Sequence, residues 1–368
     1  MFLFKYKYMA MALLFVFTTL TIAVSAHSCS LKDDEDVLFF NTFGHRNIGE
    51  GTLSVNIHGW IFEREDKSLW RRFAKKLFIN KADFPRIGPE LTQFSERSTY
   101  FLADNESDKA LTIQIGELEF QLPASQKNGH FETVITLPVS ELTPLNSADW
   151  VFFRIHEGHK NSTKFSGQCN IINETGISVI SDIDDTIKIS NILNKRDKLR
   201  GAFLYPFAGT EGTAKAYSNW ESEGAAFHYV TGSPWQLYPF LKEGAADTGF
   251  PQGSFHMVSK DISPEALFKK KGGEVGNFKV DTITEIINAF PGRKYILVGD
   301  CGQHDPEVYA EIYQLFPEQI LHIFVREIKE GDMSTERFDK TFKDVPKDMW
   351  DIFSDETVNL LQDYSIVR

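Results

Sequence analysis

The pattern of hydrophobic and polar positions changes near Gly176. Before this residue, apolar side chains mostly occupy every second position, which is typical of strands with one buried face. The alternation is clear in residues 53–57, 111–115 and 118–122, and the Gly116-Glu117 step between the last two predicts a hairpin. Residues 131–137 and 150–155 are further strand candidates. We therefore expect an antiparallel β-sandwich in this half.

One segment of this half has helical periodicity instead. Residues 67–77 would place four apolar side chains on one helical face and basic side chains on the remainder: Leu69, Trp70, Phe73 and Leu77, against Lys67, Arg71, Arg72, Lys75 and Lys76. Such a helix could lie on an anionic membrane surface as a peripheral contact. Alternatively, it packs on the sandwich and exposes an ordinary solvated face.

After Gly176, short apolar runs alternate with helical patterns. The runs span residues 177–183, 226–230, 254–258, 295–298 and 321–325, and the helical patterns span 212–223, 235–246, 278–290 and 306–316. This alternation predicts right-handed crossovers and a mainly parallel sheet with helices on both faces. We expect the charged tail, residues 333–368, to pack on this sheet as helices.

Composition narrows the class of protein. Of the 368 residues, 42% are hydrophobic and 24% are charged, which excludes wholesale disorder. The formal net charge of −12 argues against a nucleic acid as the main partner. An acidic protein can still act on anionic substrates where a metal ion and local basic groups reverse the field.

The N-terminus has the features of a signal peptide. Lys5 and Lys7 precede an uncharged apolar stretch at residues 9–24, and small residues lead to a cleavage site after Ala26. We expect residues 1–26 to be removed and the protein to be exported to a periplasmic or extracellular space. The alternative is an uncleaved N-terminal membrane anchor.

The mature chain is then expected to hold two domains. Residues 27–175 would form the β-rich domain, and residues 176–368 would form the α/β domain with its C-terminal tail. Cys29 and Cys169 could pair in an exported protein, which would leave Cys301 as the odd thiol.

Three predicted strands end in chemically suggestive residues. The first ends at Asp182, Asp184 and Thr186, the second at Thr231-Gly232-Ser233, and the fourth at Asp300 and Asp305. Because the carboxyl ends of parallel strands meet at one sheet edge, these groups should converge. Each motif alone is weak evidence, since acidic loops and Gly-Ser turns are common. Together, in this order, they predict phosphoryl transfer.

Each residue type suits one part of that reaction. We expect Asp182 to attack phosphorus and form an aspartyl-phosphate. Asp184 would carry protons, first to the leaving oxygen and later from the attacking water, so Asp184 should be protonated while Asp182 is ionised. Thr231 can donate a hydrogen bond to a phosphoryl oxygen, and Lys279 can neutralise its charge. Lys269, Lys270 and Lys271 compete with Lys279 for that role.

The candidate ligands are all oxygens, which favours Mg²⁺. We expect the side chains of Asp182 and Asp300 and the backbone carbonyl of Asp184 to bind the ion, with Asp305 nearby. Three residues beside the catalytic groups are candidate substrate-binding residues: Thr186, Gly232 and Ser233.

Taken together, the four motifs resemble those of haloacid dehalogenase superfamily phosphatases. More narrowly, residues 181–188, 229–235 and 299–307 are similar to the actin-patch-associated (App-type) phosphatidate phosphatase family. Three N-terminal pieces match the segment that precedes this domain in bacterial members: residues 58–62, 101–105 and 128–131. Cys301 stands where the family usually has serine.

The resemblance implies a Rossmann-like fold and magnesium-dependent hydrolysis of phosphatidate to diacylglycerol and phosphate. It also implies a small flap, residues 189–207, that leaves the site open to a bulky or membrane-held substrate. Two alternatives remain: the same chemistry on a soluble phosphomonoester, and a non-catalytic binding module that has kept the fold.

Overall fold

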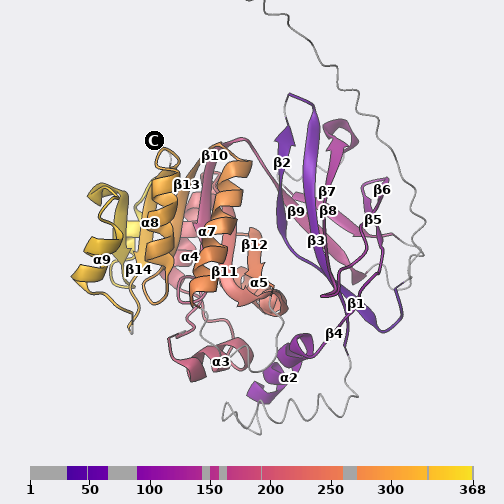
Figure 1. Cartoon of the computed structure of the whole chain (residues 1–368), viewed down its shortest axis with the longest axis horizontal. Coiled ribbons are helices and arrows are strands. Elements are labelled where there is room, and N and C mark those ends of the chain that lie inside the picture. The colour runs from indigo at the N-terminus through magenta and orange to yellow at the C-terminus, as the bar shows by residue number, and fades with distance from the viewer. Residues whose placement is uncertain are drawn as a thin grey trace, which may run out of the picture.

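The computed structural model describes residues 31–47, 49–64, 89–142, 150–156, 164–191, 193–259, 272–329 and 331–366. Several sequence-based predictions lie outside these ranges: the signal peptide at 1–26, Cys29, the basic helix at 67–77 with its five basic residues, and the lysines at 269–271. In the described part, two sheets lie side by side (Figure 1). The first is mostly antiparallel and the second is parallel and flanked by helices.

The N-terminal sheet has nine strands in one connected network. The strands are β1 (Glu35–Phe39), β2 (Thr42–Asn47), β3 (Thr52–Glu63), β4 (Asp104–Asn105), β5 (Thr112–Ile115), β6 (Leu118–Gln121), β7 (His130–Pro138), β8 (Trp150–Ile155) and β9 (Ser166–Ile172). The predicted antiparallel pairing is confirmed for all of these pairs except β2–β9, which is parallel. One connected sheet replaces the two separate sheets of the expected sandwich.

The long strand β3 organises this sheet. Its amino-terminal half pairs with β2 on one side, its carboxyl-terminal half pairs with β1 on that same side, and β7 pairs along the other side. Inward side chains of β3, β5 and β8, such as Ile57, Ile113 and Phe153, share one core. The predicted β5–β6 hairpin is confirmed, and Gly116 has the positive φ of 58° that its tight turn requires.

The second sheet has six parallel strands in the order β12-β11-β10-β13-β14-β15. They are β10 (Thr175–Ser181), β11 (Ala226–Pro234), β12 (Ser254–Val258), β13 (Gly292–Asp300), β14 (Ile320–Arg326) and β15 (Trp350–Phe353). The first five match the apolar runs of the sequence. The sixth corrects the prediction of an all-helical tail: four residues are too short a run to show strand periodicity, and only pairing with β14 makes them a strand.

Helices cover both faces of this sheet (Figure 1), as the sequence predicts. Successive strand residues point to opposite faces, so Val179 packs in the core under α4 and Ile180 in the core under α7. The helices are α4 (Glu211–Ser222), α5 (Tyr238–Asp247) and α10 (Asn359–Gln362) on the first side, and α7 (Gly272–Ala289), α8 (Asp305–Leu315) and α9 (Thr335–Thr341) on the second.

The two sheets meet along the edge strand β12. The backbone N–H of Phe255 donates to the carbonyl of Asn41 at 3.0 Å, and the side chain of Asn41 accepts from the Tyr238 hydroxyl at 2.9 Å. This contact covers an edge that would otherwise expose unpaired backbone groups.

A second contact joins two helices at the foot of the molecule, α2 (Pro89–Phe101) and α3 (Lys195–Phe203) (Figure 1). Arg97 of α2 donates to the carbonyl of Ala202 at 3.0 Å, and Phe94 packs with Phe203. Among the described residues, none of the helices is both long and apolar enough to span a bilayer.

Candidate active site

The strand order reverses between β10 and β13, and the predicted site lies at this point. β10 continues to β11 and β12 on one side, and β13 to β14 and β15 on the other. The crevice between two such strands is where open α/β sheets bind ligands. Asp182 follows β10 directly and Asp300 ends β13, so these two acids reach the same crevice.

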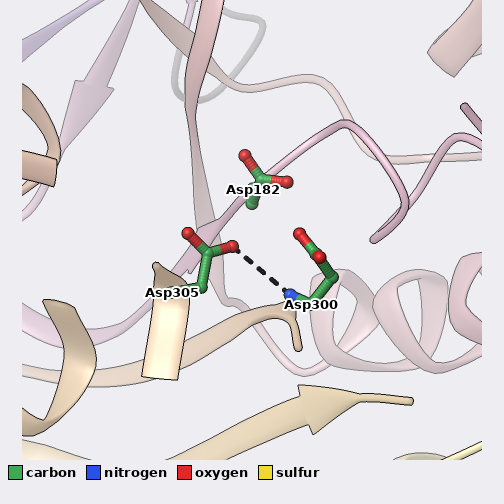
Figure 2. Close-up of side chains that lie close together, drawn as sticks. All are labelled: Asp182, Asp300 and Asp305. Atoms are coloured by element: carbon green, nitrogen blue, oxygen red, sulfur yellow. Dashed lines mark hydrogen bonds between the residues drawn. The ribbon is translucent and has the colours of Figure 1, made fainter. Parts of the chain in front are cut away.

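Three carboxylates gather there. Asp182, Asp300 and Asp305 each offer an oxygen within 4.8 Å of the other two, and all three are buried. Figure 2 shows their carboxyl groups around a common space, with the backbone N–H of Asp300 donating to Asp305 Oδ2 at 3.3 Å. Asp305 occupies the first turn of α8, where the positive end of the helix dipole favours an acid.

Lys279 reaches the same cluster from α7. Its Nζ donates to Asp182 Oδ1 at 2.7 Å and to Asp305 Oδ1 at 2.5 Å. Burial alone would lower the pKa of Lys279, but the two carboxylates raise it above its ordinary value, so the lysine is charged. The structure thus brings together Asp182, Lys279, Asp300 and Asp305, as the sequence predicts.

The residues of this cluster fit a divalent cation. Three buried acids face one buried lysine, so the cluster carries excess negative charge when ionised. Asp300 Oδ2 is buried and has no hydrogen-bond partner among the described residues. An unpartnered buried carboxylate oxygen is costly unless a ligand satisfies it. Oxygen donors alone suit Mg²⁺ better than softer metals.

Asp184 lies beside this cluster but has a separate set of partners. Its Oδ1 accepts from Ser190 Oγ and its Oδ2 from Ser233 Oγ, both at 2.7 Å, and Lys188 Nζ lies 3.6 Å from Oδ1. Burial raises the pKa of Asp184, but Lys188 and the two hydroxyls more than offset this, so the pKa is below its ordinary value.

The pKa values of the two acids are ordered differently from the sequence-based expectation. Burial raises the pKa of Asp182 to about 7, against the attraction of Lys279 and with the help of Asp305. The structure without a cation therefore holds a proton more readily on Asp182 than on Asp184. The expected order concerns the site with a bound cation and stays a prediction. The pKa shifts without a cation arise from burial and charged neighbours, which the spacing of the two acids does not reveal.

The second predicted strand end contributes the turn after β11. Thr231 Oγ1 accepts from the backbone N–H of Ser233 at 3.1 Å, so this turn is closed by its own threonine. At Gly232, a side-chain carbon would meet Val275 Cγ1 at 2.7 Å, which explains the glycine. Thr186 Oγ1 donates to Asp182 Oδ2 at 3.3 Å. Thr186, Thr231 and Ser233 are all buried at the site.

Asp185 has a structural role. It adopts a left-handed conformation with φ of 63°, which an aspartate tolerates better than most residues. Its Oδ1 accepts from the backbone N–H groups of Ser190 and Asn191, both at 2.7 Å. This turn carries the chain from the site into the flap.

Two residues at the site were not singled out from the sequence. Lys188 and Ser190 are both buried and both contact Asp184. Their proximity to residues 182–186 in the sequence was the only available signal. Proximity in the sequence does not show whether Lys188 and Ser190 contact Asp184 or lie in a solvated loop. The turn at Asp185 decides this, because it brings the chain back toward Asp184.

Trp235 follows the Ser233 turn and lines two cavities. One, of about 640 Å³, is lined by aromatic and amide side chains including Trp60, Asn105 and Asn128. The other, of about 880 Å³, is more apolar and includes Phe43 and Phe278. The three N-terminal pieces named above meet here: Trp60 Nε1 donates to Asn105 Oδ1 at 2.9 Å, and His58 Nε2 lies 3.0 Å from His130 Nδ1.

Comparison with known proteins concerns mainly the second sheet. Residues 177–327 match the family described as "Phosphatidate phosphatase APP1, catalytic domain". The chain is 33% identical over 174 residues to phosphatidate phosphatase APP1 of Saccharomyces cerevisiae, covering 46% of this chain and 29% of that protein. It is 30% identical over 174 residues to an uncharacterised protein of Schizosaccharomyces pombe, covering 45% of this chain and 27% of that protein.

The chain thus spans less than a third of the length of these curated relatives. Among solved structures, a sialyltransferase from Photobacterium damsela aligns over 65% of this chain and 41% of its own, at 11% identity and a TM-score of 0.21. So low a score supports no statement about fold or function.

Proposed function

We propose that this protein is an exported, magnesium-dependent enzyme that hydrolyses phosphatidate to diacylglycerol and phosphate, because residues 177–327 match the catalytic-domain family of phosphatidate phosphatase APP1. One observation carries the proposal: the family match coincides with the four-residue cluster of Asp182, Lys279, Asp300 and Asp305 at the switch point of the sheet. We also assign the sheet to the haloacid dehalogenase-like fold, on the strand order and on the strand ends that supply these residues.

In the proposed first step, one Asp182 carboxylate oxygen attacks phosphorus. A phosphorus–oxygen bond to Asp182 forms, and the bond from phosphorus to the glycerol oxygen breaks. Asp184 gives its proton to that leaving oxygen, which releases diacylglycerol. Lys279 holds Asp182 in place and balances its charge, and the Thr231–Ser233 turn binds phosphoryl oxygens.

In the second step, Asp184 takes a proton from water. The hydroxide that forms attacks phosphorus, the bond between phosphorus and the Asp182 oxygen breaks, and inorganic phosphate leaves. Asp184 suits this step, because Ser190, Ser233 and Lys188 stabilise its ionised form. Donation in the first step requires that the substrate phosphate, as a nearby anion, raise the pKa of Asp184.

Asp182, Asp300 and Asp305 would hold the Mg²⁺, together with the backbone carbonyl of Asp184. When bound, the ion supplies positive charge that lowers the pKa of Asp182 and neutralises the phosphoryl oxygens. This reverses the pKa order found without a cation.

The test is phosphate release by the mature chain with Mg²⁺. Substrates should include phosphatidate, lysophosphatidate, sugar phosphates and nucleotides, and Asp182→Asn and Asp281→Asn should be measured in parallel. Asp281 is exposed on α7, so its substitution removes an acid outside the site. Full activity in Asp182→Asn would refute the mechanism. Release from sugar phosphates or nucleotides alone would favour a soluble phosphomonoester, and no release from any substrate would favour a binding module.

The export part of the proposal rests on residues 1–26. Expression of the complete chain with its N-terminus should yield a secreted or periplasmic protein that begins at His27. N-terminal sequencing of the purified product checks this. A product that keeps Met1 and remains in the membrane fraction would instead indicate an N-terminal anchor.

A further inference from the structure

The flap, residues 189–207, carries an unusual share of exposed apolar surface. Among the described residues, seven large apolar side chains are exposed, and three of them lie on the flap: Ile189, Leu193 and Tyr205. Their exposed fractions are 46%, 39% and 41%. The other four are distributed over strands and helices elsewhere, so only the flap concentrates such residues within a short segment. Concentrated apolar exposure marks a surface that binds something.

Two of these side chains, Ile189 and Leu193, lie next to the candidate active site. A side-chain carbon at Gly302 would lie 3.3 Å from Leu193 Cδ1 and 2.9 Å from Asp300 Oδ1, so Leu193 is close to the metal cluster. Ser190, next to Ile189, contacts Asp184. A molecule or surface that binds this part of the flap would therefore lie close to Asp184 and the carboxylate cluster.

The flap is also locally cationic. It contains Lys195, Arg196, Lys198 and Arg200 but only one acid, Asp197, in a chain whose net charge is −12. Lys198 is exposed on α3, so its charge is available to an anionic surface. Apolar side chains next to basic ones match an anionic lipid surface, where the first enter the interface and the second meet the headgroups.

The underside of the flap is fixed, so its outer surface is available. Leu199, Phe203 and Leu204 point inward and pack with Phe94 of α2. Arg97 of α2 donates to two flap carbonyls, those of Gly201 and Ala202. These contacts hold the inner side of the flap against α2. Figure 1 shows α3 beside α2 at one end of the molecule.

We propose that Ile189, Leu193, Tyr205 and Lys198 form a membrane-docking surface on the flap that sets the candidate active site against an anionic bilayer. The inference rests on the proposed function, because it supplies the way in which a lipid phosphate would reach Asp182. It extends that function in two ways. The substrate would be a lipid within a bilayer, and contact between the flap and the bilayer would bring this lipid to the site.

Vesicle binding tests this surface without requiring catalysis. The mature chain in EDTA is mixed with vesicles of phosphatidylcholine alone or with phosphatidylserine, and the bound fraction is measured by flotation. The flap variant is Ile189→Ser/Leu193→Ser/Tyr205→Ser. The matched control is Phe152→Ser/Leu315→Ser/Leu360→Ser, whose residues are exposed by 51%, 53% and 42%.

We expect the unmodified chain to prefer vesicles with phosphatidylserine. The flap variant should lose affinity for them by about tenfold or more, because three apolar side chains no longer enter the interface, and the control should bind like the unmodified chain. Equal binding by the flap variant and the control would overturn the proposal. So would a dimer of the unmodified chain that the flap variant dissolves, since the surface would then belong to a second copy.

A second readout keeps the native apolar residues beside the label, in case the triple variant does not fold. A cysteine at Tyr205→Cys or at Phe152→Cys is labelled with an environment-sensitive fluorophore, with the labelled unmodified chain as background. Anionic vesicles should shift the emission of the label at position 205 to shorter wavelength and leave that at 152 unchanged. No shift at 205 would overturn the proposal.

Hydrolysis assays separate this inference from the proposed function. The flap variant should lose activity on phosphatidate in vesicles more than on a short-chain, water-soluble phosphatidate. Flap-dependent vesicle binding without phosphatidate hydrolysis would refute the proposed function and leave the docking surface standing. Equal loss on both substrates, with unchanged vesicle binding, would refute the docking surface alone.

Discussion

Each sheet buries a group of charges, and the two groups differ in their balance. Beside the N-terminal sheet, Lys109 Nζ lies 2.6 Å from Glu35 Oε1 and 3.5 Å from Glu106, while Lys32 lies 3.3 Å from Glu35. In these ion pairs, two acids therefore meet two lysines, of which Lys109 is buried and Lys32 is largely exposed. At the parallel sheet, the only lysine among the described residues that forms ion pairs with the three clustered acids is Lys279.

The pKa shifts reflect this difference. Burial raises the pKa of Glu35, but Lys109 and Lys32 more than offset it, so the net shift is downward. The pKa of Asp300 is raised well above its ordinary value by burial and by Asp305 and Asp182. A balanced group can stabilise a fold by itself, whereas an unbalanced one needs a ligand. The comparison thus distinguishes a structural charge network from a functional one.

The largest expected effect comes from the nucleophile. Asp182→Asn should lower phosphate release by roughly 1,000-fold or more, since an amide cannot form the covalent intermediate. It should also raise the Tm in EDTA, because it removes one of the three buried acids that share a single lysine. Phosphate release and thermal unfolding measure the two effects. Glu35→Gln, in the balanced network, should keep activity and lower the Tm, and the opposite pattern would contradict the distinction.

The two lysines offer a matched pair, since each is 4% exposed. Lys279→Met should lower kcat by about 100-fold, because Asp182 and the phosphate lose their neutralising charge. Lys109→Met should leave kcat nearly unchanged but lower the free energy of unfolding by about 3 kcal/mol, because it leaves Glu35 buried without its closest partner. Steady-state kinetics and urea unfolding check both variants. A loss of kcat in Lys109→Met would mean that the networks are not separate.

If Mg²⁺ binds as proposed, removing it should change only the stability that depends on the acids around Lys279, and the change should depend on pH. In EDTA, the folded-state pKa of Asp182 is raised to about 7, so the folded protein binds more protons than the unfolded chain. The extra stability that this proton gives the folded state is present at low pH and is lost as pH rises through about 7.

Mg²⁺ should replace those protons, so the rise in Tm that it causes should be small at pH 5.5 and larger at pH 8. Differential scanning calorimetry at both pH values measures it. Asp182→Asn/Asp300→Asn should abolish the rise. An equal rise at both pH values would show that Mg²⁺ acts elsewhere.

The smallest effect concerns two buried hydroxyl groups, Ser233 beside the candidate active site and Ser254 away from the clustered acids. Ser233→Ala removes a hydrogen bond to Asp184 and should lower kcat by about tenfold, with a shift in the pH profile. Ser254→Ala removes the hydroxyl that hydrogen-bonds to both His228 and His256 and should cost about 1 kcal/mol of stability without changing the pH profile. An unchanged pH profile in Ser233→Ala would argue against Asp184 as the proton carrier.

Much of the fold follows from local patterns. The strands at β10–β14 and helices α4, α7 and α8 follow from periodicity, although α7 begins six residues before the predicted helix, at Gly272. β2 was missed, because Thr42–Asn47 has no alternation strong enough to signal a strand. β15 was missed for the same reason, since its pairing with β14 gives it its structure.

The sequence by itself determined which acids reach the switch point, because strand periodicity and the order of parallel strands place Asp182, Asp300 and Asp305 at one edge. Only the tertiary structure decided the charge balance of that edge, the protonation order of Asp182 and Asp184, and the face of the flap that is exposed. The reason is physical: the pKa of a buried group and the exposure of a side chain depend on neighbours brought close by the fold, such as Lys279, Ser233 and Arg97, and not on neighbours in the chain.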